Sequence, residues 1–498
     1  MTPDSLAGAD RNELDSPEPM AEHFRKQRTT ERGYAPATGD ELPVRARHHW
    51  LLFLAAIQLL LAVPVTAAAP IGSDGPVLGT AEQQAAESLL LRLLADPEVK
   101  AAMAKAEAEL SRDPIAQTAD GKARLAHAVE QLTASLVLSE YAGDVHRPRF
   151  ILSTENTPRH WFGRDVPGSA IANDNPDQIN RLSFIDGNGT YEISGRVDVE
   201  RRPAQLSFSL LKGWRAGITP PQQTGKVFLG NQYATRMLED LTVGADGSFS
   251  FTLGPNNNPH DPTHIRLEPG PYIVQVREVL ADWRRQMPPK LSIRRTDQVT
   301  VPRLSDEDIR RSVLAHLHDW VTYWGTYSHR FLGGLPPNSV GGPFAREGGI
   351  GYLALARFRL KPGQAAVMTI TGGGAAYFGM LGMDPWMITF DGRSTLASLN
   401  RSQSVANPDG SFTYVASPTD PGVANWIDTS GLHDGFLSAR WLGVPNGHGP
   451  DGLLREFSII NLADLSKGAL PEVPRATAAA RQAQLKDRGI DYGRRFGK

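Results

Sequence analysis

Apolar residues recur at helical spacing in some parts of the chain and at alternating positions in others. Between residues 80 and 141 leucine, valine and alanine return every three or four positions, which predicts helices packed against a larger body or, alternatively, a helical dimerisation arm. Ser305 and Asp308 have capping-box spacing at the start of another periodic run, which predicts one long helix. Alternating apolar residues predict strands with one buried face over 190–199, 272–279 and 436–441.

Two strand-rich regions share a spacing that indicates an internal duplication. The tetrapeptide Asp-Gly-Ser-Phe begins at Asp246 and again at Asp409, an offset of 409 − 246 = 163 residues. Arg277 and Arg440 stand at the same offset, since 440 − 277 = 163. Asp-Gly between alternating residues is a strong hairpin signal. We therefore expect two equivalent β units, with a chance recurrence of the turn as the alternative.

The repeated spacing defines the expected halves and their connection. Residues 190–280 and 353–442 are expected to superpose, with 205–209 equivalent to 368–372 by the same offset. The 48 glycines and 37 prolines also favour turns, and hence a mainly β fold with helical additions. The predicted segments are a polar extension at 1–49, an export or anchor segment at 50–69, a helical segment at 80–142, a first β-sandwich unit at 149–300, a connecting helix at 305–331, a second β-sandwich unit at 350–460 and an amphipathic surface helix in the tail at 470–498.

An apolar run near the N-terminus follows basic residues. Arg45 and Arg47 precede residues 50–69, and Val65-Thr66-Ala67 fits a signal-peptide cleavage site. Cleavage would export the protein, whereas an uncleaved run is just long enough to anchor it in a membrane. An ordinary buried helix is the third interpretation. We expect the folded body to lie outside the cytoplasm, in the periplasm or cell envelope.

Composition excludes several classes of site. The 52 basic and 54 acidic residues balance, so no overall charge recruits nucleic acid. The absence of cysteine excludes disulfides, thiolate zinc sites and a cysteine nucleophile. His316 and His318 diverge on a helix, and Pro262 interrupts helical spacing between His260 and His264. We therefore expect neither a metal site nor a cofactor.

Several short segments resemble one bacterial family. They are NDNPD (173–177), YEISGR (191–196), VREVLADW (276–283), LSIRR (291–295) and DPGVANWIDTSG (420–431) with ARW (439–441). They resemble the domain-of-unknown-function family numbered 1214, often joined to its companion 1254. The resemblance covers roughly residues 80–460, and DPGxxNW is its most specific element. It implies jelly-roll-like β-sandwich units with helical additions, and no particular activity.

The stretch from residue 377 to 441 concentrates the candidate chemistry. Asn425 and Asp428 flank Trp426 on a predicted loop, where the polar groups would orient a ligand while the indole stacks on it. We expect Trp426 to be partly exposed in a pocket between the β units, although a tryptophan buried in the core is the structural alternative. The predicted ligand-binding residues are Tyr377, Asp384, Trp386, Asn425, Trp426, Asp428, His433 and Arg440.

Two classes of function follow from these residues. The first is an exported or membrane-anchored protein that binds a small amphipathic or saccharide-like ligand without catalysis. The second is a metal-independent hydrolase or lyase that uses Asp428, His433 and Arg440 as an acid–base cluster. A structural alternative also exists for Arg277 and Arg440, which would pair with Asp or Glu and clamp the sandwich edges.

Overall fold

The computed structural model describes residues 76–212, 231–298, 300–332, 335–346, 350–445 and 449–497, all within one compact unit. The expected extension at 1–49 and the expected export segment at 50–69 lie outside these residues. None of the helices in these ranges is long and apolar enough to span a bilayer.

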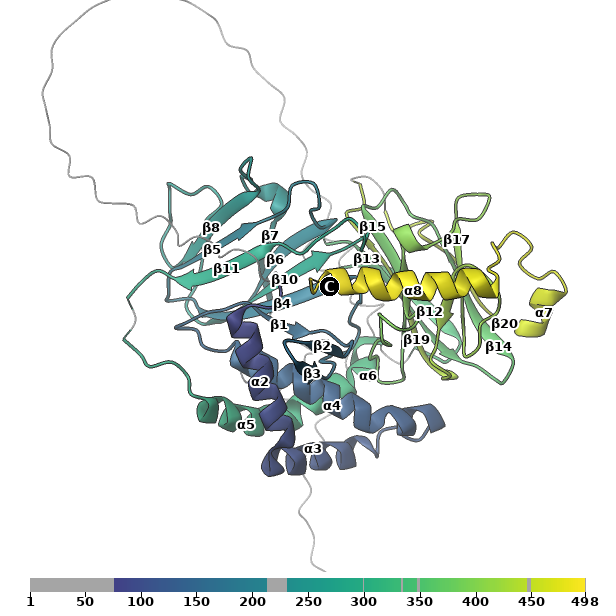
Figure 1. Ribbon diagram of the computed structural model, residues 1–498, viewed down its shortest axis with the longest axis horizontal. Coiled ribbons are helices and arrows are strands. Elements are labelled where there is room, and N and C mark those ends of the chain that lie inside the picture. Colours follow the sequence, from purple (N-terminus) through teal and green to yellow (C-terminus); the bar gives the residue numbers. More distant parts are fainter. Residues whose placement is uncertain are drawn as a thin grey trace, which may run out of the picture. The chain divides into compact units, whose positions relative to one another are not determined.

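The first β unit is a sandwich of two sheets (Figure 1). Its strands are β1 (Ile151–Thr154), β4 (Gln178–Asp186), β5 (Tyr191–Arg196), β6 (Gln205–Lys212), β7 (Asn231–Met237), β8 (Ser248–Gly254), β9 (Ile265–Arg266), β10 (Pro271–Val279) and β11 (Lys290–Arg295). The five-stranded sheet has the order β1-β4-β10-β6-β7, and the four-stranded sheet has the order β11-β5-β8-β9. A separate hairpin pairs β2 (Arg159–Trp161) with β3 (Arg164–Val166).

The second β unit repeats this topology. Its strands are β12 (Ser339–Ala345), β13 (Tyr352–Arg359), β14 (Gln364–Ile370), β15 (Tyr377–Met383), β16 (Ser398–Asn400), β17 (Phe412–Ser417), β18 (Trp426–Asp428), β19 (Asp434–Leu442) and β20 (Leu454–Asn461). The sheets have the orders β12-β13-β19-β15-β16 and β18-β17-β14-β20. The strands correspond one to one: β12 takes the place of β1, and β13 to β20 take the places of β4 to β11 in the same sequence. With this substitution the strand orders of the two units are identical. Even the parallel pair β8–β9 has its counterpart in β17–β18.

This topology confirms the predicted duplication but corrects its upstream alignment. Gly247 and Gly410 occupy equivalent turns before β8 and β17, with φ of 82° and 80° that favour glycine. Upstream, Phe208 of β6 pairs with Val276, as Met380 of β15 pairs with Ala439. The offset there is 380 − 208 = 172, so residues 205–209 match β15 and not residues 368–372 in β14. The single offset fails because the β15–β17 connection is shorter than the β6–β8 connection.

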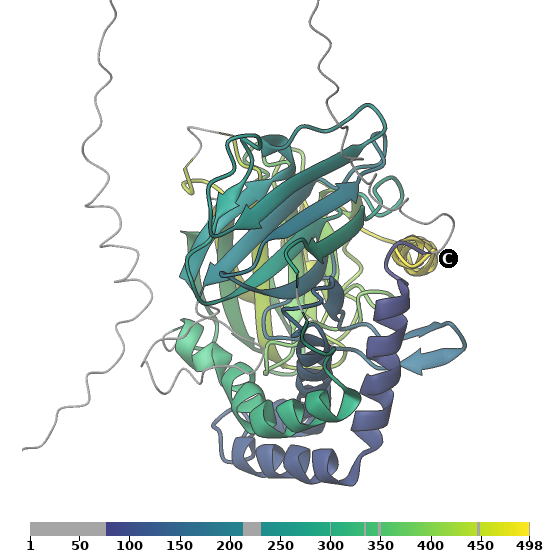
Figure 2. The same ribbon diagram turned by 90° about the vertical axis from the view of Figure 1, so that its left-hand side faces the viewer.

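The helices between residues 81 and 332 gather at one end of the sandwiches, whereas the two later helices lie apart from them (Figures 1 and 2). Ser305 caps α5 through the predicted capping box with Asp308. The segment expected at 80–142 contains three helices, and the connecting segment at 305–331 contains two. Strand β12 precedes residue 350, so the second unit begins earlier than predicted. The helices are α2 (Ala81–Ala95), α3 (Pro97–Leu110), α4 (Ala119–Tyr141), α5 (Asp306–Gly325), α6 (Tyr327–Leu332), α7 (Leu462–Ser466) and α8 (Ala478–Arg494).

Helix α8 lies along the second β unit, with its C-terminal end beside the first (Figure 1), and its inner face carries arginines. Arg481, Arg488 and Arg495 follow one another at seven-residue spacing and are all buried. The Arg481 guanidinium lies 5.2 Å from the Trp426 ring, and those of Arg488 and Arg495 lie 4.5 Å and 5.0 Å from the Trp283 ring. The expected amphipathic surface helix is therefore attached to the body by cation–π contacts of these arginines, together with the apolar packing of Leu485 and Tyr492.

In the central strands β10 and β19, successive side chains point into two different hydrophobic cores. Val274 and Leu437 point into the first and second sandwich, respectively. Their neighbours Ile273 and Phe436 point outward and join the apolar cluster that includes the helices. The faces of the two five-stranded sheets that point away from the sandwich cores are therefore also buried inside the protein. The candidate site lies on these faces.

Candidate functional site

The loop Asn173–Asp177 joins the first sandwich to the second through buried hydrogen bonds. The Tyr377 hydroxyl donates to Asp177 Oδ2 at 2.8 Å, and Asn400 Nδ2 donates to Asp177 Oδ1 at 2.8 Å. Asn175 Nδ2 donates to the Tyr377 hydroxyl at 3.0 Å. Tyr377, expected to contact a ligand, has no exposed surface and lies at a buried junction between the two sandwiches.

Arg440, on central strand β19, reaches the same loop. Its Nη2 donates to the Asn173 carbonyl at 2.5 Å, to Asn173 Oδ1 at 2.9 Å and to the Asp174 carbonyl at 3.2 Å. The residue is 3% exposed, and burial lowers the pKa of its guanidinium. Each of these acceptors is uncharged, so the loop holds Arg440 in place without neutralising it.

Two further arginines lie near Arg440, and we call Arg277, Arg346 and Arg440 the arginine cluster. Arg277, on β10, donates to the neutral acceptors Ser209 Oγ at 3.1 Å and Gln275 Oε1 at 2.7 Å. Arg346 directly follows β12, and its buried Nη1 has no hydrogen-bond partner among the described residues. Arg277 and Arg346 remain partly exposed, so the cluster is not sealed from solvent.

The electrostatics of the arginine cluster show that its charges act on one another. Burial, with Arg440 as the next cause, lowers the pKa of Arg277 to about 10. Burial lowers the pKa of Arg346 well below its usual range, and Arg440 and Arg277 contribute to the change. No carboxylate in the described part of the chain forms an ion pair with any of the three. The expected clamp through pairing with Asp or Glu was therefore wrong.

The carboxyl groups of Asp174 and Asp177 offset the positive charge of the arginine cluster only in part. Burial raises the pKa of Asp174 to about 7, with Glu155 adding to the increase, while Arg440 and the Asn180 hydrogen bond oppose it. Burial also raises the pKa of Asp177. Near neutral pH the negative charge beside the cluster is therefore incomplete. Buried positive charge without a counter-ion is costly, so the arrangement favours an anionic partner.

Asp384 and Trp386 lie elsewhere, in the turn after β15. The Asp384 side chain has no exposed surface and accepts from Arg124 Nε at 3.1 Å and from the backbone amide of Trp386 at 2.9 Å. Trp386 Nε1 donates to the Gly121 carbonyl at 2.8 Å. These contacts attach the turn to α4, and they leave neither side chain facing a pocket.

The expected loop around Trp426 is a strand, and the expected exposure of its ring was wrong. Trp426 begins β18, which pairs in parallel with β17. Its side chain is 8% exposed within the core of the second sandwich, and Nε1 donates to the Ser417 carbonyl at 3.1 Å. The side-chain amide of Asn425, also buried, accepts from the backbone amide of Val405 through Oδ1 and donates to the Val405 carbonyl through Nδ2, each at 2.8 Å. Strand pairing on one side and these bonds on the other turn the indole inward.

The proposed acid–base residues are not brought together. Asp428 is half-buried at the end of β18 and accepts from the Ser430 amide at 2.8 Å. His433 contributes its backbone amide to Asp120 Oδ2 at 2.6 Å. Within the ranges described above, no hydrogen bond or ion pair links Asp428, His433 and Arg440 to one another. Nor do those ranges contain a group of three or more His, Asp or Glu side chains placed to hold a metal ion.

Sequence reasoning identified Arg440 but missed most of its surroundings. The signal available was the equivalence of Arg277 and Arg440 in the duplication, which places both on central strands. The run of Asn and Asp at 173–177 was a second signal, because such a dense polar run needs many partners when buried. Nothing in the sequence around Arg346 indicated that it would join them.

Comparison with known proteins supports the fold. No family model matches the chain, and no curated protein matches it. A solved structure of an uncharacterised Burkholderia cenocepacia protein is similar at 20% identity and TM-score 0.60, covering 75% of this chain and 99% of that one. A Vibrio parahaemolyticus protein is 10% identical with TM-score 0.35, covering 67% and 99%. The chain thus shares the fold of the Burkholderia cenocepacia protein, and the resemblance to the family numbered 1214 stays a prediction.

Proposed function

We propose that the protein binds a small amphipathic or saccharide-like ligand carrying a carboxylate or phosphate, at the arginine cluster between its two sandwiches. The observation that supports this most is the convergence of Arg277, Arg346 and Arg440 without an ion-pair partner among the described residues. Arginine presents a planar fork of donors that matches carboxylate and phosphate groups.

The strand register supplies neutral polar groups beside these charges. On the outer face of the first sandwich, Arg277 pairs across the sheet with Asn180 of β4 and Ser207 of β6. The Ser207 hydroxyl is buried and has no hydrogen-bond partner in the described chain. Hydroxyl and amide groups around a cationic centre suit a ligand that has hydroxyls as well as an acidic group.

Catalysis has less support than binding. The hydrolase or lyase alternative requires Asp428, His433 and Arg440 to act together, but each contacts a different part of the structure. The arginine cluster contains donors and no candidate nucleophile paired with a base. We therefore favour a binding protein.

Ligand titration tests the proposal. We expect acidic sugars and sugar phosphates to bind in calorimetry, and their uncharged parent sugars to bind at least tenfold more weakly. Arg346→Gln, which removes a partly exposed and unpaired charge, should weaken binding of the acidic ligand by roughly 1.5–3 kcal/mol, about tenfold or more. Arg455→Gln is the control, because Arg455 pairs with Asp409 at an exposed turn. Equal binding of acidic and neutral sugars, or full binding by Arg346→Gln, would contradict the proposal.

The proposal includes a location outside the cytoplasm, which rests on the basic and then apolar residues between 45 and 69. A phosphatase that is active only outside the cytoplasm, fused after residue 80, is expected to be active. Deleting residues 50–69 from the same fusion should abolish that activity. An inactive full-length fusion that is nevertheless present in the cell would rule the location out.

A further inference from the structure

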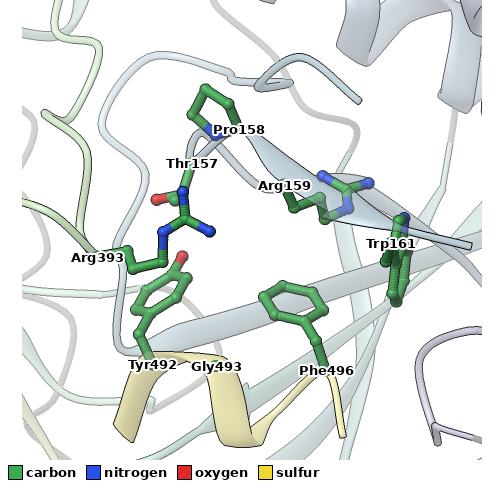
Figure 3. A pocket seen from close by; sticks show the side chains of 8 residues that line it. All are labelled: Thr157, Pro158, Arg159, Trp161, Arg393, Tyr492, Gly493 and Phe496. Atoms are coloured by element: carbon green, nitrogen blue, oxygen red, sulfur yellow. The ribbon is translucent and has the colours of Figure 1, made fainter. Parts of the chain in front are cut away.

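A small cavity lies where the C-terminal end of α8 meets the β2–β3 hairpin (Figure 3). Its volume of about 10 Å³ is close to the minimum that holds one water-sized particle. None of its lining residues belongs to the arginine cluster. They are Thr157, Pro158, Arg159, Trp161, Arg393, Tyr492, Gly493 and Phe496.

Arg159 brings unsatisfied donors to this cavity. The residue is 4% exposed, and its Nη2 donates to the buried carboxylate of Glu87. Its Nε and Nη1 are buried and lack a hydrogen-bond partner among the described residues. Glu87 also accepts from Trp161 Nε1 at 2.7 Å and from Gln83 Nε2 at 3.0 Å, so its acceptor capacity is largely used. A buried charged donor without an acceptor is costly, and this indicates a missing acceptor.

Arg393 adds positive charge on the opposite side. Figure 3 shows its guanidinium beside Thr157 and Tyr492, across the cavity from Arg159. No described side chain forms a hydrogen bond or ion pair with this guanidinium, and the residue is only partly exposed. Its charge therefore has no counter-ion in this part of the structure.

The remaining charged groups near the cavity do not supply one. The Tyr492 hydroxyl donates to Glu155, and the amide of Thr157 donates to the same carboxylate at 3.1 Å. Arg495 lies 3.9 Å from the Tyr492 ring and leaves its own Nε and Nη2 buried without a partner. Arg159 thus shares the Glu87 carboxylate with Trp161 and Gln83. The Glu155 carboxylate is used by Tyr492 and Thr157, and among the described residues neither carboxylate pairs with Arg393 or Arg495.

We propose that this cavity is a binding site for one monovalent anion of the size of chloride, held by Arg159 and Arg393. Chloride is slightly larger than water, so the lining side chains have to shift slightly to admit it, whereas sulfate or an organic carboxylate would require a larger movement of Trp161 or Phe496. Water fits by size, but a water molecule needs acceptors for its own protons, and the free groups of the lining are mainly donors. An acceptor that carries negative charge satisfies both arginines.

Halide substitution tests the site in the full-length protein. Crystals grown with bromide are expected to show an anomalous peak in the cavity, in contact with both arginines. The melting temperature should rise saturably by about 2–4 °C when chloride or bromide replaces gluconate at constant ionic strength. Arg393→Gln should abolish this halide-dependent rise. Arg401→Gln, which changes an exposed arginine in the short turn Arg401–Gln403, should preserve it.

The outcomes separate this site from the proposed function. A cavity without a bromide peak, or a halide response that survives Arg393→Gln, would overturn the anion site. Bromide bound at the arginine cluster alone would also overturn it, while leaving ligand binding there untouched. Arg277→Gln should weaken binding of the acidic ligand and leave the halide response unchanged, because Arg277 does not line the cavity.

Discussion

Trp426→Ala is expected to lower the free energy of unfolding by about 3–5 kcal/mol, as large aromatic truncations in a core do. The ring lies in the core of the second sandwich with 8% of its surface exposed. Its Nε1 donates to the Ser417 carbonyl, and the Arg481 guanidinium of α8 covers one side at 5.2 Å. Truncation therefore leaves a cavity and also removes a contact that fastens α8. Urea denaturation followed by circular dichroism measures the change.

Val405→Ala is the control for this prediction. The backbone of Val405 forms hydrogen bonds with the Asn425 side chain, but the Val405 side chain is 48% exposed. Its truncation should change the free energy of unfolding by less than about 0.5 kcal/mol, as surface substitutions usually do. If Trp426→Ala cost no more than Val405→Ala, the indole would be exposed in solution, as the sequence pattern alone predicted.

Glu278→Ala is expected to lower the free energy of unfolding by a similar amount, about 3–5 kcal/mol, for an electrostatic reason. Glu278 Oε1 lies 2.6 Å from Arg181 Nε, and the two side chains are 0% and 4% exposed. Burial raises the pKa of Glu278, while Arg181 opposes the increase. Removing the carboxylate leaves the Arg181 guanidinium buried with the Pro289 carbonyl as its remaining acceptor. Thermal and urea denaturation measure the loss.

Two variants show whether the unpaired charge is the cause. Arg196→Ala breaks the exposed pair with Asp246, whose side chains are 53% and 54% exposed, and should have little effect. Glu278→Leu combined with Arg181→Met removes both charges and should recover most of the stability lost in Glu278→Ala. A double variant as unstable as the single one would instead attribute the loss to packing.

Local signals predicted the elements of this fold well. Ser305 and Asp308 cap α5 because the capping box depends only on residues three apart. The turns at Asp246-Gly247 and Asp409-Gly410 formed because glycine allows the positive φ that each turn requires. Strand β12 was missed because its glycines and proline resemble a linker, and pairing with β13 overrides that local preference.

The candidate site was harder to predict, because it depends on contacts between distant residues. Tyr377 and Arg440 were both predicted as ligand contacts, and both lie at the junction of the two sandwiches. Their partners are in the loop Asn173–Asp177: Asp177 is 200 residues before Tyr377, and Asn173 is 267 residues before Arg440. Alternation along a strand shows that two faces exist, but it does not show which of them becomes an interface.

The amino-acid sequence by itself determined the mainly β fold, its duplication and the positions of its principal turns, since these arise from periodicity and from residues a few positions apart. Only the tertiary structure decided which side chains converge. Strand pairing buried Trp426, and the packing of the two sandwiches brought Arg346 to Arg277 and Arg440. Which side chains converge depends on how the two sheets and α8 pack against one another. The order of residues along the chain does not specify the distances between side chains that are far apart in sequence.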